Sequence, residues 1–342
     1  MTTPHANDAG SPAAQLRDGW NRSITNLRIS VTDRCNFRCV YCIPEENIEW
    51  LPRGQLASLE ELARIARIAV GLGVRRLRLT GGEPLLRKNL PSLVAELAAL
   101  PGLDDIALTT NGTELPRLAR DLADAGLERV NVSLDSLDRA TFAKLAQRDL
   151  LPDVLAGIEA AVNAGLTPLS INCVVIRGTN DHEVVTFARF ARERGFEVRF
   201  IEFMPLEHGQ RWGEHALVPG RELRERIEAV FPLLPSPDQD PHAPSRDWVF
   251  ADGAPGVMGF IDSVTAPFCD GCTRIRLTAD GKLRTCLFSL NEHDLLGPIR
   301  AGASDEAVAK LLCAAVSTKE LKHHITDGLF VKPQRTMSQI GG

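Results

Sequence analysis

The chain has 342 residues, of which 44% are apolar and 24% are charged, as in an ordinary folded protein with a large core. Its net charge of −5 argues against a general binder of nucleic acid. The N-terminus lacks the charged start and apolar run of a signal peptide, and no stretch is apolar enough to span a membrane. We therefore expect a cytoplasmic protein with neither nucleic acid nor a membrane as partner, whose eight cysteines bind metal, do chemistry or pack inside.

Strands and helices are expected to alternate from residue 26 to residue 205. The first strand is "NLRISVT", and a later one is "DIALTTN". Four more follow a glycine that closes a helix, in "GLGVRRLRLT", "AGLERVNVSL", "AGLTPLSINC" and "RGFEVRFIEF". About six β–α units in strict alternation predict an α/β fold with a parallel sheet. Periodicity alone leaves open whether that sheet is a partial TIM-like barrel or doubly wound.

Composition divides the chain into five segments. Residues 1–22 are expected to be a flexible tail, and residues 23–231 hold the β–α units. Residues 232–257 contain six prolines and are expected to form a loop. Residues 258–330 carry a second group of cysteines, and residues 331–342 form a tail that ends in Gly-Gly.

The first strand is followed by Cys35, Cys39 and Cys42, spaced C-x3-C-x2-C. Three thiolates can hold three irons of a 4Fe-4S cluster and leave the fourth iron open, whereas electron-transfer clusters use four cysteines. An open position is what catalytic metal sites keep for a substrate or cosubstrate. The alternatives are a zinc site completed by a distant residue, or reactive cysteines in a loop. The sequence favours a cluster with one open iron.

A second triad consists of Cys269, Cys272 and Cys286. A zinc ribbon would need two C-x2-C pairs, and only one pair is present here. A second open cluster is therefore favoured over zinc. Cys173, in a strand, and Cys313, in a helix, are expected to be packing residues.

Arginines recur at alternate positions of three expected strands. Arg28 shares a strand face with Ser30 and Thr32, while "RRLRLT" places Arg76, Arg78 and Thr80 together and "TRIRLT" places Arg274 beside Arg276. Such a face is usually solvated, but helices cover the outside of a parallel barrel, so these arginines should line its cavity. The guanidinium fork suits phosphate.

Together with the two triads, several further motifs carry a family resemblance. They are "RLTGGEPLLR", "TTNGTEL", "VNVSLDSLD", "INCVVIRGTND", "VRFIEFMPL" and a terminal "IGG". From about residue 24 to the last residue, the chain resembles the GTP 3′,8-cyclase family of the radical S-adenosylmethionine (SAM) superfamily. The resemblance implies a partial (β/α)6 TIM-like barrel, the radical SAM core, with a C-terminal extension that carries a second iron–sulfur cluster.

The resemblance also implies an activity, its cofactors and its partners. Two 4Fe-4S clusters and SAM would be the cofactors of a radical reaction. The radical formed from SAM would take hydrogen from C3′ of GTP, after which the ribose radical would attack C8 of the guanine. The product would be (8S)-3′,8-cyclo-7,8-dihydroguanosine 5′-triphosphate, in the first step of molybdenum cofactor biosynthesis. Partners would be a second copy in a homodimer, the downstream cyclic pyranopterin monophosphate synthase, and an electron donor such as flavodoxin or ferredoxin.

Residue roles follow from the resemblance position by position. Cys35, Cys39 and Cys42 would bind the SAM cluster, and Cys269, Cys272 and Cys286 the cluster that contacts the substrate. The SAM contacts would be Tyr41, Gly82, Glu83, Ser133 and Met204. The GTP contacts would be Arg28, Arg76, Arg78, Thr109, Arg199, Arg274, Ile275 and Arg276. Gly341, Gly342 and Arg276 would be catalytic, the tail entering the active site to orient the arginine. Without the resemblance, "GGEP" is a plain turn and "IGG" a frayed end.

One position departs from the family pattern. Ser170 stands where the family typically has a lysine that would face the substrate phosphates. Its absence predicts weaker GTP binding, by about 1.5–3 kcal/mol, unless another cation compensates.

Other functions also remain open. One alternative is another two-cluster radical SAM enzyme, such as a peptide-modifying maturase, although those usually carry more cysteines in the C-terminal half. Another is a non-catalytic iron–sulfur redox or sensor protein, which would leave the open irons without a purpose. A zinc-binding structural protein is the least favoured.

Overall fold

The computed structural model describes residues 15–43, 50–206, 212–325 and 329–341. These residues form one sheet of 12 strands in the order β12-β11-β10-β1-β2-β3-β4-β5-β6-β9-β8-β7. The strands are β1 (Asn26–Ser30), β2 (Arg76–Thr80), β3 (Asp105–Thr110), β4 (Arg129–Ser133), β5 (Ser170–Val175), β6 (Glu197–Glu202), β7 (Leu233–Pro235), β8 (Arg246–Phe250), β9 (Val257–Ile261), β10 (Arg274–Leu277), β11 (Lys282–Arg284) and β12 (His293–Asp294). No helix among the described residues is long and apolar enough to cross a membrane.

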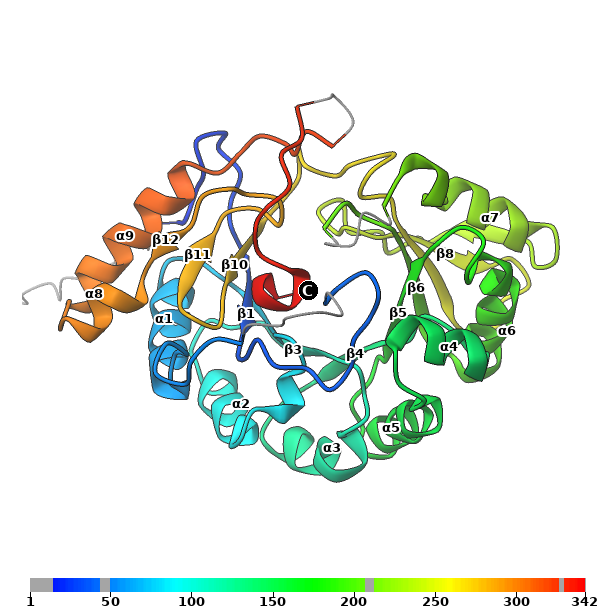
Figure 1. Ribbon diagram of the computed structural model, residues 1–342, viewed down its shortest axis with the longest axis horizontal. Helices are drawn as coiled ribbons and strands as arrows, with labels where there is room; N and C mark the ends of the chain where they lie inside the picture. The colour runs from blue at the N-terminus through cyan, green and yellow to red at the C-terminus, as the bar shows by residue number, and fades with distance from the viewer. Residues whose placement is uncertain (1–14, 44–49, 207–211, 326–328, 342) are drawn as a thin grey trace, which may run out of the picture.

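Helices cover the outside of the curved sheet, which opens on one side (Figure 1). They are α1 (Leu59–Gly71), α2 (Leu90–Ala98), α3 (Leu115–Asp124), α4 (Arg139–Ala146), α5 (Leu151–Asn163), α6 (Val184–Arg194), α7 (Gly220–Glu228), α8 (Leu296–Arg300) and α9 (Asp305–Ser317). The short helix α10 (Met337–Ile340) lies inside the curve of the sheet instead. A capping box begins α1, since the Ser58 and Glu61 side chains each accept a hydrogen bond from the other residue's main-chain N–H. The six predicted strands are confirmed as β1 to β6, each followed by at least one helix between α1 and α7, and the sheet is a partial TIM-like barrel rather than a doubly wound sheet.

The apolar half of each inner strand packs under the helices. Leu27, Ile29, Leu77 and Leu79 are at most 1% exposed and belong to one continuous core. The alternate residues of the same strands therefore face the inside of the barrel, as the sequence predicted for the arginines.

The C-terminal region extends the parallel sheet at both edges, which the sequence analysis did not predict. Strand β10 pairs in parallel with β1, and β9 pairs in parallel with β6. Because these two strands lie at opposite edges, the connection formed by residues 262–273 has to cross the open side of the barrel. Cys269 and Cys272 lie on this connection.

Two expectations about individual segments and one about a cysteine are wrong. Residues 15–22 are packed, since Leu16 is 1% exposed and its N–H donates to Leu72. Residues 232–257 are not loop throughout, because β7 and β8 form an antiparallel pair within them. For the C-terminal tail, the alternative of a frayed end is contradicted, since α10 forms there and Ile340 is buried. Cys173 is buried as expected, whereas Cys313 is exposed and is no packing residue.

Helix α5 approaches the loop after β3 so closely that only glycine fits at residue 157. A Cβ atom at Gly157 would lie 2.0 Å from the carbonyl oxygen of Gly112, in the "TTNGTEL" motif. We expect Gly157→Ala to lower the free energy of unfolding by about 1–3 kcal/mol, as overpacking of a filled site does. Gly71→Ala, at a helical glycine with nothing within 4 Å of the added atom, should leave stability equal or higher. Chemical denaturation of both variants measures the difference, and equal stabilities would contradict this packing.

Candidate active site

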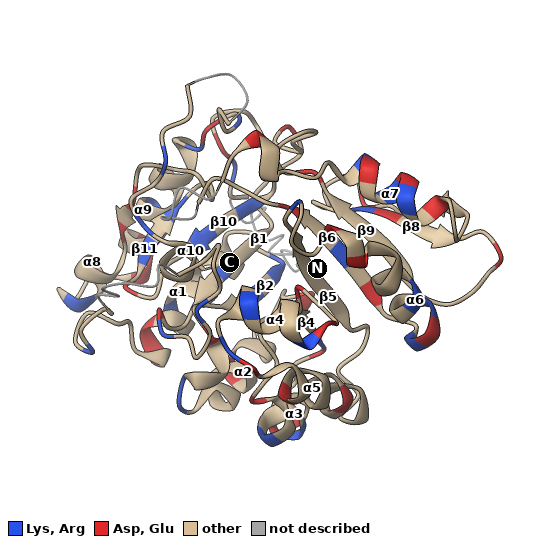
Figure 2. Ribbon diagram, turned by 45° about the vertical axis from the view of Figure 1, so that its right-hand side comes forward, with Lys and Arg blue, Asp and Glu red and all other residues tan. Residues whose placement is uncertain are grey.

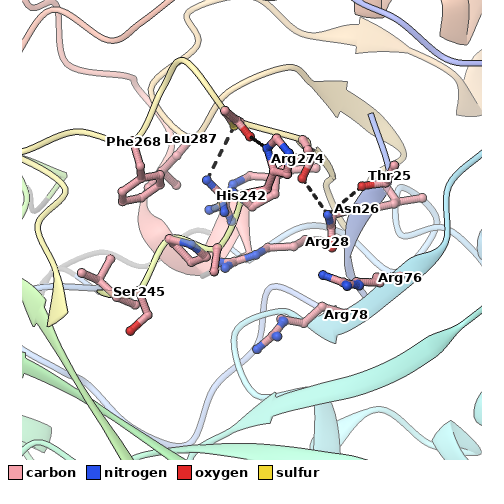
Figure 3. A pocket seen from close by; sticks show the side chains of 18 of the residues that line it. Thr25, Asn26, Arg28, Arg76, Arg78, His242, Ser245, Phe268, Arg274 and Leu287 are labelled. Carbon is pink, nitrogen blue, oxygen red and sulfur yellow. Dashed lines mark hydrogen bonds between the residues drawn. The ribbon is translucent and has the colours of Figure 1, made fainter. Parts of the chain in front are cut away.

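The inner face of the barrel encloses a cavity of about 900 Å³, at the large end of the range for small-molecule sites. Strands β1 to β6 supply one wall. The segment 240–245, the connection 268–274 and residues 285–288 supply the other. Positively charged positions gather on β10, β1 and β2 around this space (Figure 2). In the close view, Arg28, Arg76, Arg78 and Arg274 extend toward it (Figure 3).

Three arginines stand in one row across adjacent strands. Strand pairing sets Arg28 beside Arg276 on one side and beside Arg78 on the other. Burial lowers the pKa of both Arg28 and Arg78, and the nearby positive charges of Arg276 and Arg28, respectively, lower it further. Within the described residues, neither Arg28 nor Arg78 has a hydrogen-bonding or ionic partner. Two enclosed guanidinium groups without counter-ions make this wall a site for an anion.

The other predicted arginines have partners. Arg76 is exposed and pairs with Asp240 at 3.2 Å. The guanidinium of Arg274 lies over the ring of Phe268, 4.8 Å from its centroid. Arg276 donates to the main-chain oxygen of Gly341.

The remaining assigned positions divide between the cavity and the core. Thr109 and Met204 line the cavity. Ile275 is fully buried in the apolar core, so only its main chain is left for a substrate contact. A Cβ atom at Gly341 would lie 3.1 Å from both Ser30 and Thr80, so the tail fits tightly against the first two strands. Gly342 lies outside the described residues.

Ser170, which replaces the expected lysine, takes part in a small polar cluster. Its hydroxyl donates to Oε2 of Glu197 at 2.7 Å, and Arg199 donates to both oxygens of the same carboxylate at 2.6 Å. The charge of Arg199 is therefore balanced by Glu197. This wall of the cavity lacks the uncompensated cation that a lysine would have supplied.

Asn131 is a cavity residue that the sequence analysis missed. Its side chain is 1% exposed, and neither its amide oxygen nor its amide nitrogen has a hydrogen-bonding partner. Burying an unpaired polar group costs about 1–3 kcal/mol, so the amide is arranged for a ligand with both a donor and an acceptor. The sequence held a signal: Asn131 is the polar, inward-facing position of the strand in "VNVSL".

The second cysteine triad lines the same cavity as the arginines. Burial raises the pKa of Cys269 and Cys286. Burial also acts on Cys272, but there Lys319 and Arg274 outweigh it and lower the pKa to about 7. Three thiols enclosed beside fixed cations suit an anionic iron–sulfur group better than isolated packing residues.

The first triad lies in the loop after β1, against the "TGGEP" turn. A Cβ atom at Gly82 would lie 2.3 Å from the carbonyl oxygen of Arg34, so glycine is required for this turn to pack beside Cys35. Cys35, Cys39 and Cys42 are half-buried, and burial is the largest cause that raises the pKa of each thiol; at Cys39 the charges of Asp135, Cys42 and Cys35 raise it further. Three thiols in one enclosed loop form a donor set that fits a cluster.

Two of the predicted SAM contacts near this triad, Glu83 and Tyr41, already have hydrogen-bonding partners in the protein. Glu83 accepts hydrogen bonds from Leu85 N, Thr110 Oγ1 and Asn111 N, and burial raises its pKa to about 7. Tyr41 donates to Asp135 at 2.6 Å, and Ser133 is half-buried at the end of β4. In the described parts of the chain, no three His, Cys, Asp or Glu side chains are close enough to hold a single metal ion. The fit of both triads therefore rests on their donor type and enclosure.

Sequence and structure comparisons define the class of protein. A profile of the radical SAM superfamily matches residues 29–191, and a profile described as Molybdenum Cofactor Synthesis C matches residues 196–325. Two crystal structures share the fold at 14–15% identity. The match to Streptococcus suis SuiB bound to S-adenosylmethionine has a TM-score of 0.60 and covers 85% of this chain and 69% of that one. The match to native anSMEcpe with bound AdoMet also has a TM-score of 0.60, and it covers 87% of this chain and 81% of that one. The fold is that of a radical SAM enzyme.

Curated relatives narrow the class. The GTP 3′,8-cyclase of Moorella thermoacetica is 47% identical over 96% of this chain and 100% of its own. That of Mycobacterium marinum is 48% identical over 96% of this chain and 92% of its own. The chain belongs to the GTP 3′,8-cyclase family.

Membership in this family confirms the predicted enzyme class. The protein is a radical SAM lyase of molybdenum cofactor biosynthesis, and SAM and iron–sulfur clusters are its cofactors. The maturase alternative is not supported, because the curated relatives are GTP 3′,8-cyclases. The non-catalytic alternative is not supported, because the relatives are enzymes.

The cluster around Ser170 yields a test of the missing lysine. In Ser170→Lys, the ammonium can pair with Glu197, which frees Arg199, or can face the cavity itself, and either result adds one cation. We expect the KM for GTP to fall about tenfold, in line with one added charge-assisted hydrogen bond. Ser170→Met, of similar length and without charge, is the control in steady-state assays. Equal KM values for the two variants would show that position 170 does not act on the substrate.

Proposed function

We propose that the cavity binds GTP with its triphosphate on Arg28 and Arg78 and its guanine toward Cys269, Cys272 and Cys286. The observation that carries this proposal is the pair of unpaired guanidinium groups that share one cavity with the second triad. A triphosphate carries up to four negative charges, and guanidinium forks pair with phosphate oxygens. The ribose would then lie between the two ends, along the wall formed by Thr109 and Asn131.

The remaining cavity residues have supporting roles in substrate binding. Arg76 and Arg199 have carboxylate partners and contribute less to phosphate binding than the unpaired arginines. Gly341 holds the guanidinium of Arg276 through its main-chain oxygen. The tail and the connection 262–273 border the cavity and exclude water from it.

The SAM end is proposed to lie beside the first triad. Cys35, Cys39 and Cys42 would hold the cluster, and Tyr41, Gly82, Glu83, Ser133 and Met204 would surround SAM. When bound, SAM and its cluster supply a 5′-deoxyadenosyl radical to the reaction. The chain positions C3′ of GTP toward it and keeps the cyclising nucleotide anchored at both ends.

Partners and location are proposed from the family alone. A homodimer, a flavodoxin or ferredoxin as electron donor, the downstream synthase as the consumer of the product, and a cytoplasmic setting all fit a biosynthetic radical SAM enzyme.

Removing one unpaired guanidinium tests the proposed phosphate site. We expect Arg28→Met or Arg78→Met to raise the KM for GTP by about tenfold to a hundredfold, because each loses charge-assisted hydrogen bonds to phosphate. The control is Arg120→Met, on the exposed side of α3, where Arg120 pairs with Asp124. Iron content measured on each variant separates a binding defect from cluster loss. An unchanged KM with full iron content would place the triphosphate elsewhere.

A further inference from the structure

A buried lysine lies behind the second cysteine triad. Lys319, two residues after α9, is 3% exposed and lines the cavity. Its ammonium donates to the main-chain oxygens of Arg274, at 3.0 Å, and Thr285. Among the described residues no carboxylate pairs with it, and the neighbouring carboxylate of Glu320 instead accepts from two hydroxyl groups. An enclosed ammonium without a counter-ion is costly, so this position needs a negative group nearby.

The two carbonyls that Lys319 binds belong to the segments that carry the cysteines. Arg274 is two residues after Cys272, and Thr285 immediately precedes Cys286. One ammonium therefore holds the main chain of both segments. Its charge acts to lower the pKa of all three thiols of the triad, against their burial.

The segment that carries Lys319 is itself held in place by the N-terminal residues. Trp20 donates its ring N–H to the carbonyl oxygen of Lys319 at 3.0 Å. Arg22 pairs with the buried Asp18 and donates to the carbonyl oxygens of Glu320 and Cys269 at 2.6 and 2.8 Å. The packing of residues 15–22 thus fixes Lys319 and the loop of Cys269 relative to each other.

We propose that Lys319 is a positioning residue of the second triad, whose fixed positive charge offsets the negative charge of the cysteines and of the iron–sulfur cluster they bind. The inference rests on the proposed function, in which this triad holds a cluster. One-electron reduction makes the cluster more negative by one charge, and a nearby cation stabilises that state more than the oxidised one. Lys319 therefore raises the reduction potential of this cluster and slows its loss.

The test uses the full chain with Cys35, Cys39 and Cys42 replaced by alanine, so that only the second triad can bind a cluster. Within this background, Lys319→Met removes charge and hydrogen bonds, Lys319→Gln keeps a donor without the charge, and Lys319→Arg keeps the charge. Lys310→Met, on the exposed side of α9, is the matched control. After anaerobic reconstitution, the readouts are iron per chain, midpoint potential from a spectroscopic titration, and the rate of iron loss to a chelator.

We expect Lys319→Met and Lys319→Gln to shift the potential to more negative values and to lose iron about tenfold faster. Lys319→Arg and Lys310→Met should stay close to the parent. A potential and an iron-loss rate that do not change in Lys319→Gln would overturn the role of the charge while leaving the cluster assignment intact. A parent protein that binds no iron at this triad would instead overturn the proposed function together with the inference. If Lys319→Met fails to fold, the comparison of Lys319→Gln with Lys319→Arg decides the question.

Discussion

Like charges set side by side inside the barrel are the constraint around which the rest of the structure is arranged. Parallel pairing of β10, β1 and β2 places Arg276, Arg28 and Arg78 in one row. Adjacent like charges repel, and enclosure strengthens that repulsion, so the ligand-free protein pays for this row with stability. The cost is tolerable because the opposite face of the same strands is completely buried under the helices. A polyanionic substrate removes the repulsion, so binding energy and electrostatic relief act in the same direction.

The C-terminal region turns this charged wall into a closed site. By adding β10 at one edge and β9 at the other, it forces residues 262–273 across the open side of the barrel. The second triad is thereby placed at the edge of the cavity, with Cys269 and Cys272 on this connection and Cys286 just after β11. Lys319 and Arg22 then fix that triad from behind, through main-chain carbonyls on both sides of it. The substrate cavity is therefore shared between the two family segments, at residues 29–191 and 196–325.

The features that could be predicted from the sequence are those that depend on residues close together along the chain. The six β–α units and the inward face of Arg28 and Arg78 follow from strict alternation along each strand. Strands β9 and β10 pair with β6 and β1, and each pairing joins residues far apart in sequence. No periodicity reports such pairing. The β7–β8 pair was not predicted because the prolines in residues 232–257 indicated a loop.

The polar network of the site depends on the register between strands. Ser170 meets Glu197 because β5 and β6 pair at those residues, and this register fixes the balance of charge on Arg199. Lys319 gave no signal, because one lysine after a helix is ordinarily solvated.

The most direct test of this account is anaerobic incubation of the reconstituted protein with SAM, a strong reductant and GTP. 5′-Deoxyadenosine and the cyclised nucleotide are measured in the same samples, with and without GTP. The account predicts that both products form together, that both depend on GTP, and that Arg78→Met requires more GTP for each. Deoxyadenosine without cyclised nucleotide would contradict the assignment of this cavity to GTP.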